Sequence, residues 1–300
     1  MSEYDNQVGE GVQPPAKVLV IGAAGYAGTH TARAFLQAGY QVTCLQRPGG
    51  KTIPSRYPTV PGDLTDPASL TEAARGFDLV VNLGAILDED QDLASVDGLL
   101  ASGVPLIYTS GSDVSGEGYT TEDTVPIPHP FVGWRDKVER RVIDGGGIIV
   151  RPGLIYGNGG GVVGDRWIPL RDRVGAGVYL GEPGVRWGAV HVEDLAWLYV
   201  AIAKKAAPRT YWYGVSENIE VDVIADVVGG GKTMSWSLDE EPPPEIAIFA
   251  GLFRLDQECS AVKTRHALGW NPVHTSLVEA LRHELRREPK TDWRREMLDA

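Results

Sequence analysis

The stretch Lys17–Gly28, which reads K-V-L-V-I-G-A-A-G-Y-A-G, constrains the fold of this chain more than any other. Val18–Ile21 is an unbroken apolar run, which is typical of a strand buried on both faces of a parallel sheet. Gly22, Gly25 and Gly28 follow at a constant spacing of three. The stretch therefore predicts a buried strand that runs directly into a glycine-rich turn.

A helix is expected after these glycines. Ala32, Phe35 and Leu36 fall on one face of it, and Gly39 is a typical stop. In such a unit, glycines let the backbone approach a pyrophosphate closely. The helix N-terminus adds free N–H groups and a partial positive charge. The three glycines lie between a buried strand and an amphipathic helix, and this context favours dinucleotide binding over a glycine turn without a ligand.

The charge of the chain limits the classes of molecule that it is expected to bind. The net charge of −12 and the pI near 5.0 argue against nucleic acid and anionic membranes, which leaves a small-molecule substrate; a homodimer remains open. No apolar run approaches the roughly 20 residues of a membrane span. Residues 1–15 are polar and are expected to be a disordered tail rather than a signal peptide. Cys44 and Cys259 do not have the spacing of a metal site or a disulfide, so a reducing cytoplasm is the expected location. The six histidines are scattered along the chain, and we therefore expect no structural metal.

Beyond the glycine turn, strands and helices alternate through residue 152. This pattern predicts an α/β fold with a Rossmann-like, doubly wound parallel sheet. We expect residues 16–155 to form this core. Residues 156–300 are expected to return partly to it and to form a smaller C-terminal substrate lobe. Further strands are predicted over 41–46, 59–64, 78–85, 104–110 and 147–151, and helices over 131–143, 193–203 and 276–287.

The end of the second predicted strand carries information about the cofactor. A dinucleotide fold usually places Asp or Glu there to bind the adenine ribose. This chain has Gln46 followed by Arg47. A carboxylate would repel a 2′-phosphate, whereas a guanidinium binds it with two hydrogen bonds. The sequence therefore favours NADP(H) over NAD(H), with a solvated Arg47 as the alternative.

Five ordered motifs resemble the extended short-chain dehydrogenase/reductases, also called the epimerase/dehydratase family. Together they span about residues 17–287, and the family fold is a Rossmann domain with a smaller C-terminal lobe and the substrate between them. The motifs are G-A-A-G-Y-A-G at Gly22–Gly28, G-D-L-T-D at Gly62–Asp66, R-P-G-L-I-Y-G at Arg151–Gly157, V-H-V-E-D-L-A at Val190–Ala196 and L-G-W-N-P at Leu268–Pro272.

The resemblance implies a role for each matching position. His191 and Asp194 would shape the pocket, although a buried, hydrogen-bonded His191 is an equal reading. The implied cofactor contacts run from the phosphates through the adenine and the ribose to the nicotinamide. They are Gly22, Gly25, Tyr26, Ala27 and Gly28, then Asp63 and Leu64, then Leu83, Gly84 and Ala85, and finally Pro152, Gly153 and Ile155.

The chain departs from the family at the catalytic positions. The family places Ser or Thr after the fifth strand and Tyr-x-x-x-Lys on the next helix. Here Gly111 falls at the Ser/Thr position. One register puts Phe131 and Arg135 at the Tyr and Lys positions; the other puts Gly133 and Lys137 there. Neither supplies a Tyr; the chain instead resembles an atypical branch of the family that lacks the Tyr–Lys pair, and the residues that carry this resemblance are Phe131, Trp134, Arg135 and Glu139. We expect Arg135 to neutralise cofactor charge and another group to transfer the proton.

Two functions compete on this basis. The first is an NADP(H)-dependent oxidoreductase acting on a small organic substrate, by carbonyl, imine or alkene reduction or by epimerase/dehydratase chemistry. The alternative is a catalytically inactive NADP(H)-binding sensor or scaffold. The candidate proton-transfer residues are Tyr156, His191, Ser110 and Ser112. The candidate pocket residues are Phe131, Trp134, Asn158, Arg186 and Trp187.

Overall fold

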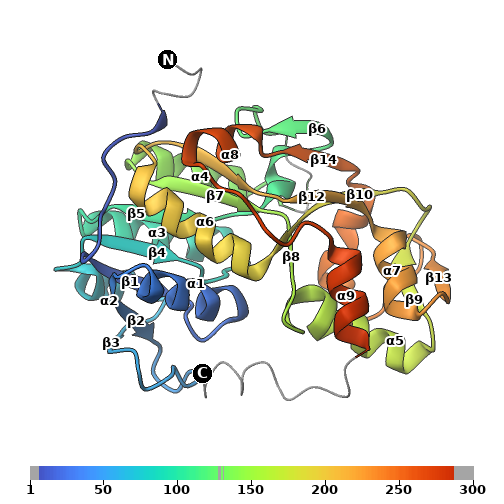
Figure 1. The fold of residues 1–300 in the computed structure, drawn as a ribbon. Coiled ribbons are helices and arrows are strands. Elements are labelled where there is room, and N and C mark those ends of the chain that lie inside the picture. The colour runs from blue at the N-terminus through green and yellow to red at the C-terminus, as the bar shows by residue number, and fades with distance from the viewer. Residues whose placement is uncertain (1–6, 128–129, 131, 287–300) are drawn as a thin grey trace.

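The computed structural model describes residues 7–127, 130 and 132–286 (Figure 1). Its centre is a seven-stranded parallel sheet with the strand order β11-β7-β5-β4-β1-β2-β3. The strands are β1 (Lys17–Ile21), β2 (Gln41–Gln46), β3 (Thr59–Pro61), β4 (Leu79–Asn82), β5 (Leu106–Thr109), β7 (Ile148–Pro152) and β11 (Tyr211–Gly214). The order reverses between β1 and β4, so the predicted Rossmann-like, doubly wound sheet is confirmed.

Helices cover both faces of this sheet. Val18 and Val20 of β1 pack with Phe35 on one side, and Leu19 and Ile21 pack with α2 and α3 on the other. The predicted burial of β1 on both faces is thus confirmed. One face carries α1 (Tyr26–Gln37) and α6 (Val192–Lys205), and the other carries α2 (Pro67–Ala74), α3 (Glu89–Ala101) and α4 (Arg135–Asp144).

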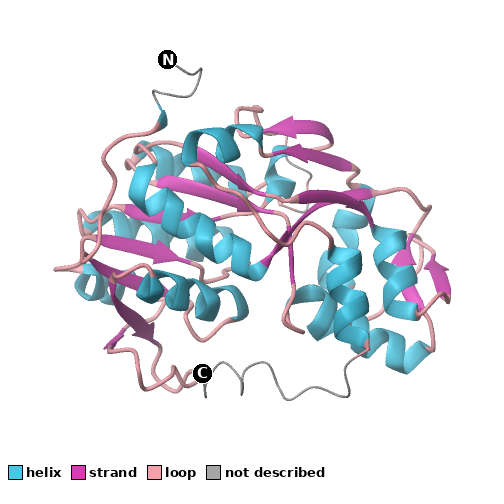
Figure 2. Cartoon of the chain, in the orientation of Figure 1, coloured by secondary structure: helices cyan, strands magenta, loops and turns pink. Residues whose placement is uncertain are grey.

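The second half of the chain adds a smaller lobe beside the carboxyl ends of the strands (Figure 2). It has its own apolar core, which includes Trp167, Ile224 and Phe253. Its short sheets contain β8 (Leu154–Tyr156), β10 (Arg186–His191) and β12 (Glu217–Glu220), then β9 (Gly177–Leu180) and β13 (Thr233–Trp236). A further two-stranded sheet, β6 (Gly118–Thr121) with β14 (Gln257–Ser260), lies beside β10. Its helices are α5 (Ile168–Val174), α7 (Val221–Gly229) and α9 (Leu277–Leu285), with a π-helical turn η3 (Val163–Trp167) and a 3-10 segment η4 (Ala247–Arg254).

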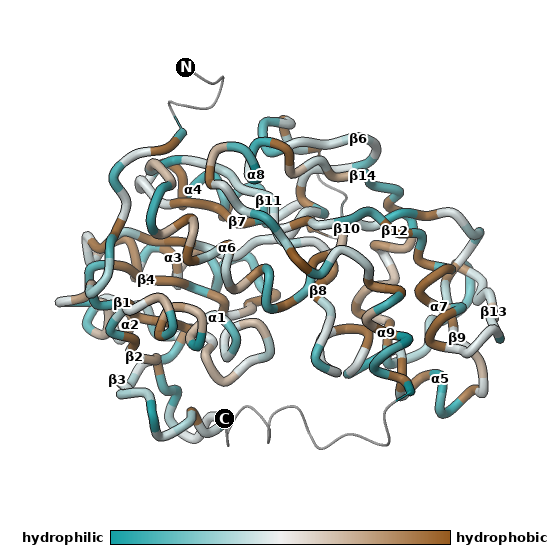
Figure 3. Tube along the Cα trace, in the orientation of Figure 1, coloured by the Kyte–Doolittle hydropathy of each residue, from teal (hydrophilic) through white to brown (hydrophobic). Residues whose placement is uncertain are grey.

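The described residues after β8 also return to the main sheet. β11 becomes its edge strand, and α6 and α8 (Val262–Leu268) pack beside it. The hydropathy colouring shows that the strands of the main sheet are mostly apolar and that many connecting loops are polar (Figure 3). Among the described residues, no helix combines the length and apolar character needed to cross a membrane.

The N-terminal segment differs from expectation. Residues 8–12 are not a free tail, because their backbone is hydrogen-bonded to the C-terminal end of α6. Gly9 N–H donates to the Lys205 carbonyl and Val12 N–H to the Ala203 carbonyl, at 2.8 and 2.7 Å. Tyr40 also donates its hydroxyl to the Val12 carbonyl. Polarity predicted disorder here, but backbone groups supply these bonds whatever the side chains are.

Candidate functional site

The glycine turn joins β1 to α1 at the point where the strand order reverses. Gly22 has φ +84°, and a Cβ there would lie 2.8 Å from the Leu83 carbonyl carbon. A Cβ on Gly28 would collide with the Gly22 carbonyl oxygen. Gly25 is different: it is the N-cap of α1, and a Cβ there meets only the Gly22 oxygen, at 3.1 Å. Two glycines therefore allow the turn itself, and the third leaves open space above it.

The helix start is free to receive an anion. Within the described residues no side chain caps α1, and its first turn carries no acidic residue. The loop after β4 forms the facing wall, where Asn82 Oδ1 accepts the Gly84 N–H at 2.9 Å. Leu64 packs against Gly84 so tightly that a Cβ on this glycine would clash with it. Gly22–Gly28 and Leu83–Ala85 thus come together as expected for a dinucleotide cradle.

The end of β2 carries Gln46 and Arg47, as expected. The Gln46 amide donates to the Arg47 carbonyl at 2.9 Å and to the Lys51 carbonyl at 3.3 Å, which orders the loop. The Arg47 side chain is exposed. Nearby, Asp63 accepts two hydrogen bonds from Thr65. These bonds, together with the charge of Arg47, lower the pKa of the Asp63 carboxyl.

A pocket of about 540 Å³ opens where β5 and β7 end, between the main sheet and the smaller lobe. This is the crevice in which doubly wound folds bind their ligands. It unites nine of the predicted site residues: Tyr26, Ala85, Ser110, Ser112, Arg135, Pro152, Gly153, Ile155 and Trp187.

Ser110 and Asp113 are two polar residues that line this pocket. The Ser110 hydroxyl is buried and has no hydrogen-bond partner among the described residues. The Asp113 carboxylate lies directly against Gly111, so that a Cβ on Gly111 would collide with Asp113 Oδ1. Burial raises the pKa of the Asp113 carboxyl, and the charge of Arg135 opposes this. The sequence motifs did not indicate Asp113 as a site residue, although it is the last residue of S-G-S-D at Ser110–Asp113, at the end of a predicted strand.

The structure also distinguishes the two registers of α4. Arg135 lines the pocket, where its Nη2 donates to the Ile86 carbonyl at 3.3 Å and its guanidinium lies 4.7 Å from the Trp134 ring centre. Lys137 instead pairs with Glu89 at the surface. Of these two cations, only Arg135 lines the pocket, whereas Phe131 lies outside the described residues. Trp134 supports Arg135 and is not part of the pocket wall.

Tyr156 and His191 do not reach this pocket. The Tyr156 hydroxyl lies 3.2 Å from Glu217 Oε1 and 3.3 Å from the His274 carbonyl, and burial raises its pKa. His191 Nδ1 accepts the Glu193 N–H at 3.3 Å, so its side chain caps α6. The sequence indicated their family motifs but not the direction of their side chains, and both are removed from the proton-transfer candidates.

Two predicted pocket residues also lie elsewhere. Asn158 donates its amide to Glu193 Oε1 at 3.0 Å. Arg186 forms ion pairs with Asp256 and Glu258. Neither residue lines the pocket, because both side chains are engaged in these contacts. Trp187, the neighbour of Arg186, does line it.

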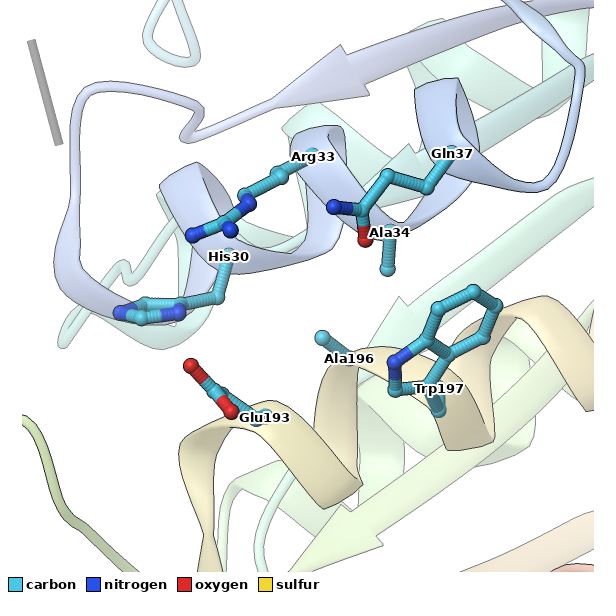
Figure 4. A pocket seen from close by; sticks show the side chains of 7 residues that line it. All are labelled: His30, Arg33, Ala34, Gln37, Glu193, Ala196 and Trp197. Carbon is cyan, nitrogen blue, oxygen red and sulfur yellow. The ribbon is translucent and has the colours of Figure 1, made fainter. Parts of the chain in front are cut away.

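A second, smaller hollow of about 80 Å³ lies between α1 and α6 (Figure 4). His30 from α1 and Glu193 from α6 point toward each other across it. His30 Nε2 is buried without a partner among the described residues, and burial lowers the pKa of this imidazole to about 4. The hollow is too small for a dinucleotide, so we assign it to the packing of α1 on α6.

Folding also gathers His191, Glu193 and His274, whose possible ligand atoms lie within 4.8 Å of one another. The sequence spacing of the histidines did not indicate this cluster. The rings of His191 and His274 are stacked, with centres 3.8 Å apart and planes 19° apart. A metal ion binds in the plane of an imidazole ring, and two stacked rings have no common in-plane point. This arrangement therefore does not fit a shared metal ion.

The strand order, the glycine turn and the pocket at the switch point define a dinucleotide-fold protein of the Rossmann type. Comparison with known families agrees: the model of the NAD dependent epimerase/dehydratase family matches residues 18–102. The resemblance to this family is thereby confirmed over the segment from β1 to α3, which includes the glycine turn.

Known proteins resemble the chain over most of its length. An uncharacterized protein of Schizosaccharomyces pombe is 26% identical over 88% of this chain and 98% of its own. The solved dTDP-glucose 4,6-dehydratase from Bacillus anthracis, in complex with NAD, superimposes with a TM-score of 0.73 at 17% identity and covers 94% of this chain and 97% of its own. UDP-glucuronic acid 4-epimerase from Bacillus cereus, also with NAD, gives 0.70 at 19% identity, covering 94% and 99%. At these identities the structures support the fold.

Proposed function

We propose that this protein is a nicotinamide-dinucleotide-dependent oxidoreductase that transfers hydride to or from a small organic substrate. The observation that carries this proposal is the shared pocket of Ser110, Asp113 and Gly153. Gly153 follows β7, where the family resemblance expects the nicotinamide end. A buried hydroxyl without a partner and a carboxyl with a raised pKa thus stand beside the expected position of hydride transfer.

The bound nicotinamide supplies or accepts the hydride. The Ser110 hydroxyl is available to hydrogen-bond a substrate oxygen or nitrogen, since no described side chain occupies it. In the direction of reduction, protonated Asp113 donates its proton to that atom while the hydride adds to carbon, and water then reprotonates the carboxylate. Asp113 thereby supplies the acid that the family's Tyr normally provides. Arg135 stabilises the carboxylate that remains, because its charge favours the ionised form.

For the cofactor we propose a preference for NADP(H). Gln46 ends β2 without a carboxylate, and the neighbouring Arg47 is exposed and able to meet a 2′-phosphate. The two solved structures described above contain NAD, so the proposed preference rests on Gln46 and Arg47 of this chain alone.

The test compares Asp113→Asn and Ser110→Ala with the exposed control Asp239→Asn. Dinucleotide binding is measured by calorimetry, and NADPH oxidation is followed with a panel of ketones, imines and nucleotide sugars. We expect both pocket variants to bind dinucleotide normally and to lose about 10²-fold or more in turnover, the usual contribution of a positioned acid or base. The reduction rate of the wild type should fall as pH rises through the raised pKa of Asp113. Binding without turnover of any compound would instead support a sensor.

A further inference from the structure

We propose that the substrate of this pocket is a neutral, largely apolar molecule with one polar group, rather than a nucleoside diphosphate sugar. This inference rests on the proposed function and specifies its substrate class. It follows from how the pocket divides into a small polar end and a large apolar wall.

The apolar wall comes from the smaller lobe and the adjoining strands. Its side chains are Leu154, Val162, Trp187, Phe249, Leu252 and Leu255. The indole N–H of Trp187 donates to the Leu252 carbonyl at 3.1 Å, so this polar group is already bonded. A sugar hydroxyl against these side chains would lose its water and find no hydrogen-bond partner. Hydrocarbon or aromatic surface, in contrast, is favoured there.

Charge gives the second argument. Arg135 is the one cation among the described residues that line the pocket, and its charge acts on the carboxyl of Asp113, which lines the same pocket. The next candidate, Arg186, is already paired with Asp256 and Glu258. A diphosphate would bring its negative charges to a pocket with one acid and one partly engaged guanidinium. The described residues therefore lack the clamp that such a ligand needs.

The pocket also displays apolar side chains toward solvent. Leu87 is 65% exposed and Ile248 is 40% exposed, and both belong to the pocket wall. Exposed apolar side chains gathered at one pocket are typical of a surface that a ligand covers. At the polar end, the Gln257 side-chain amide already donates hydrogen bonds to the carbonyls of Ser112 and Gly116. Ser110 and Asp113 remain to meet one polar group of the substrate.

The experiment titrates 2-pentanone, 2-hexanone and 2-octanone into the protein saturated with NADP⁺, so that no turnover is needed. Affinity is measured by calorimetry, with UDP-glucose as the competing class. Each added CH₂ should tighten binding roughly 4-fold, and 2-octanone should bind roughly 60-fold more tightly than 2-pentanone. UDP-glucose should show no binding. Ile248→Asn and Leu252→Asn should weaken the dependence on chain length, and Val273→Asn, 74% exposed outside the pocket, should not.

Tight binding of UDP-glucose, or ketone affinity that does not change with chain length, would overturn this inference. If NADP⁺ itself failed to bind, the proposed function would fall. The ketone series measured on the protein alone would then still decide the nature of the pocket. The two failures are therefore distinguishable.

Discussion

Glu139 of α4 and Arg151 of β7 form a buried ion pair, and both side chains are only 1% exposed. Arg151 Nε donates to Glu139 Oε1 at 3.0 Å, and Nη1 donates to the Ser115 hydroxyl at 3.1 Å. This network links α4, which carries Arg135, to the short helix Ser112–Ser115, which carries Asp113. The charged pair thus holds together the two elements that supply the polar end of the pocket.

Breaking this pair should destabilise the protein strongly. Glu139→Leu leaves a buried guanidinium without a countercharge, and the free energy of unfolding should fall by about 3–5 kcal/mol. Urea denaturation measures the loss. The double variant Glu139→Leu/Arg151→Met should recover part of it, because neither charge then remains buried. Glu72→Gln, which breaks the exposed pair with Arg75, should cost about 0–1 kcal/mol. Equal losses in the buried and exposed pairs would contradict the assignment.

Gly25→Val should abolish binding of both NADPH and NADH while the protein stays folded. The new side chain would project into the space above the turn, where the pyrophosphate is expected, and its Cβ meets only one protein atom at 3.1 Å. Calorimetric titration measures binding, and circular dichroism checks the fold. Gly9→Val is the matched control, since nothing lies within 4 Å of its Cβ position. Normal NADPH binding by Gly25→Val would show that the turn is purely structural.

Arg47→Ala should weaken NADPH binding by about 1–3 kcal/mol, the contribution of charge-assisted hydrogen bonds to a phosphate, with little effect on NADH. Dissociation constants for the two dinucleotides decide the matter. Lys51→Ala removes another exposed cation from the same loop and should leave the NADPH to NADH ratio unchanged. Equal losses for both dinucleotides in Arg47→Ala would show that Arg47 does not bind the 2′-phosphate.

Acid should destabilise the protein partly through His30. Burial lowers the pKa of this imidazole from its ordinary 6.5 to about 4, so between these values the unfolded chain binds more protons than the folded one. The stability contributed by neutral His30 is complete above pH 6.5 and is lost as pH falls toward 4. Urea midpoints at pH 7 and pH 5 should therefore differ less in His30→Gln than in the wild type. The exposed control His266→Gln should retain the full difference; an unchanged difference in His30→Gln would exclude this role.

Local sequence determined the core of the fold. The apolar run Val18–Ile21, followed by Gly22, directly predicts β1 and its turn, because burial and φ +84° each restrict the residue types. The strand Gln41–Gln46 was predicted with its observed bounds. Leu36 shows the limit of the pattern: it was expected on the buried face of α1 and is exposed, because Phe35 already fills the contact with the sheet.

The chemistry of the pocket was decided by tertiary structure. The family motifs suggested that Tyr156 and His191 lie near the cofactor. In the structure the Tyr156 hydroxyl bonds to Glu217, and the His191 side chain caps α6. Asp113 gained its place because Gly111 lacks a side chain and leaves room for a carboxylate. The sequence by itself determined which segments are buried, since burial depends on residue type and period. Which polar groups meet depends on contacts between residues distant in the chain, and only the folded structure supplies those.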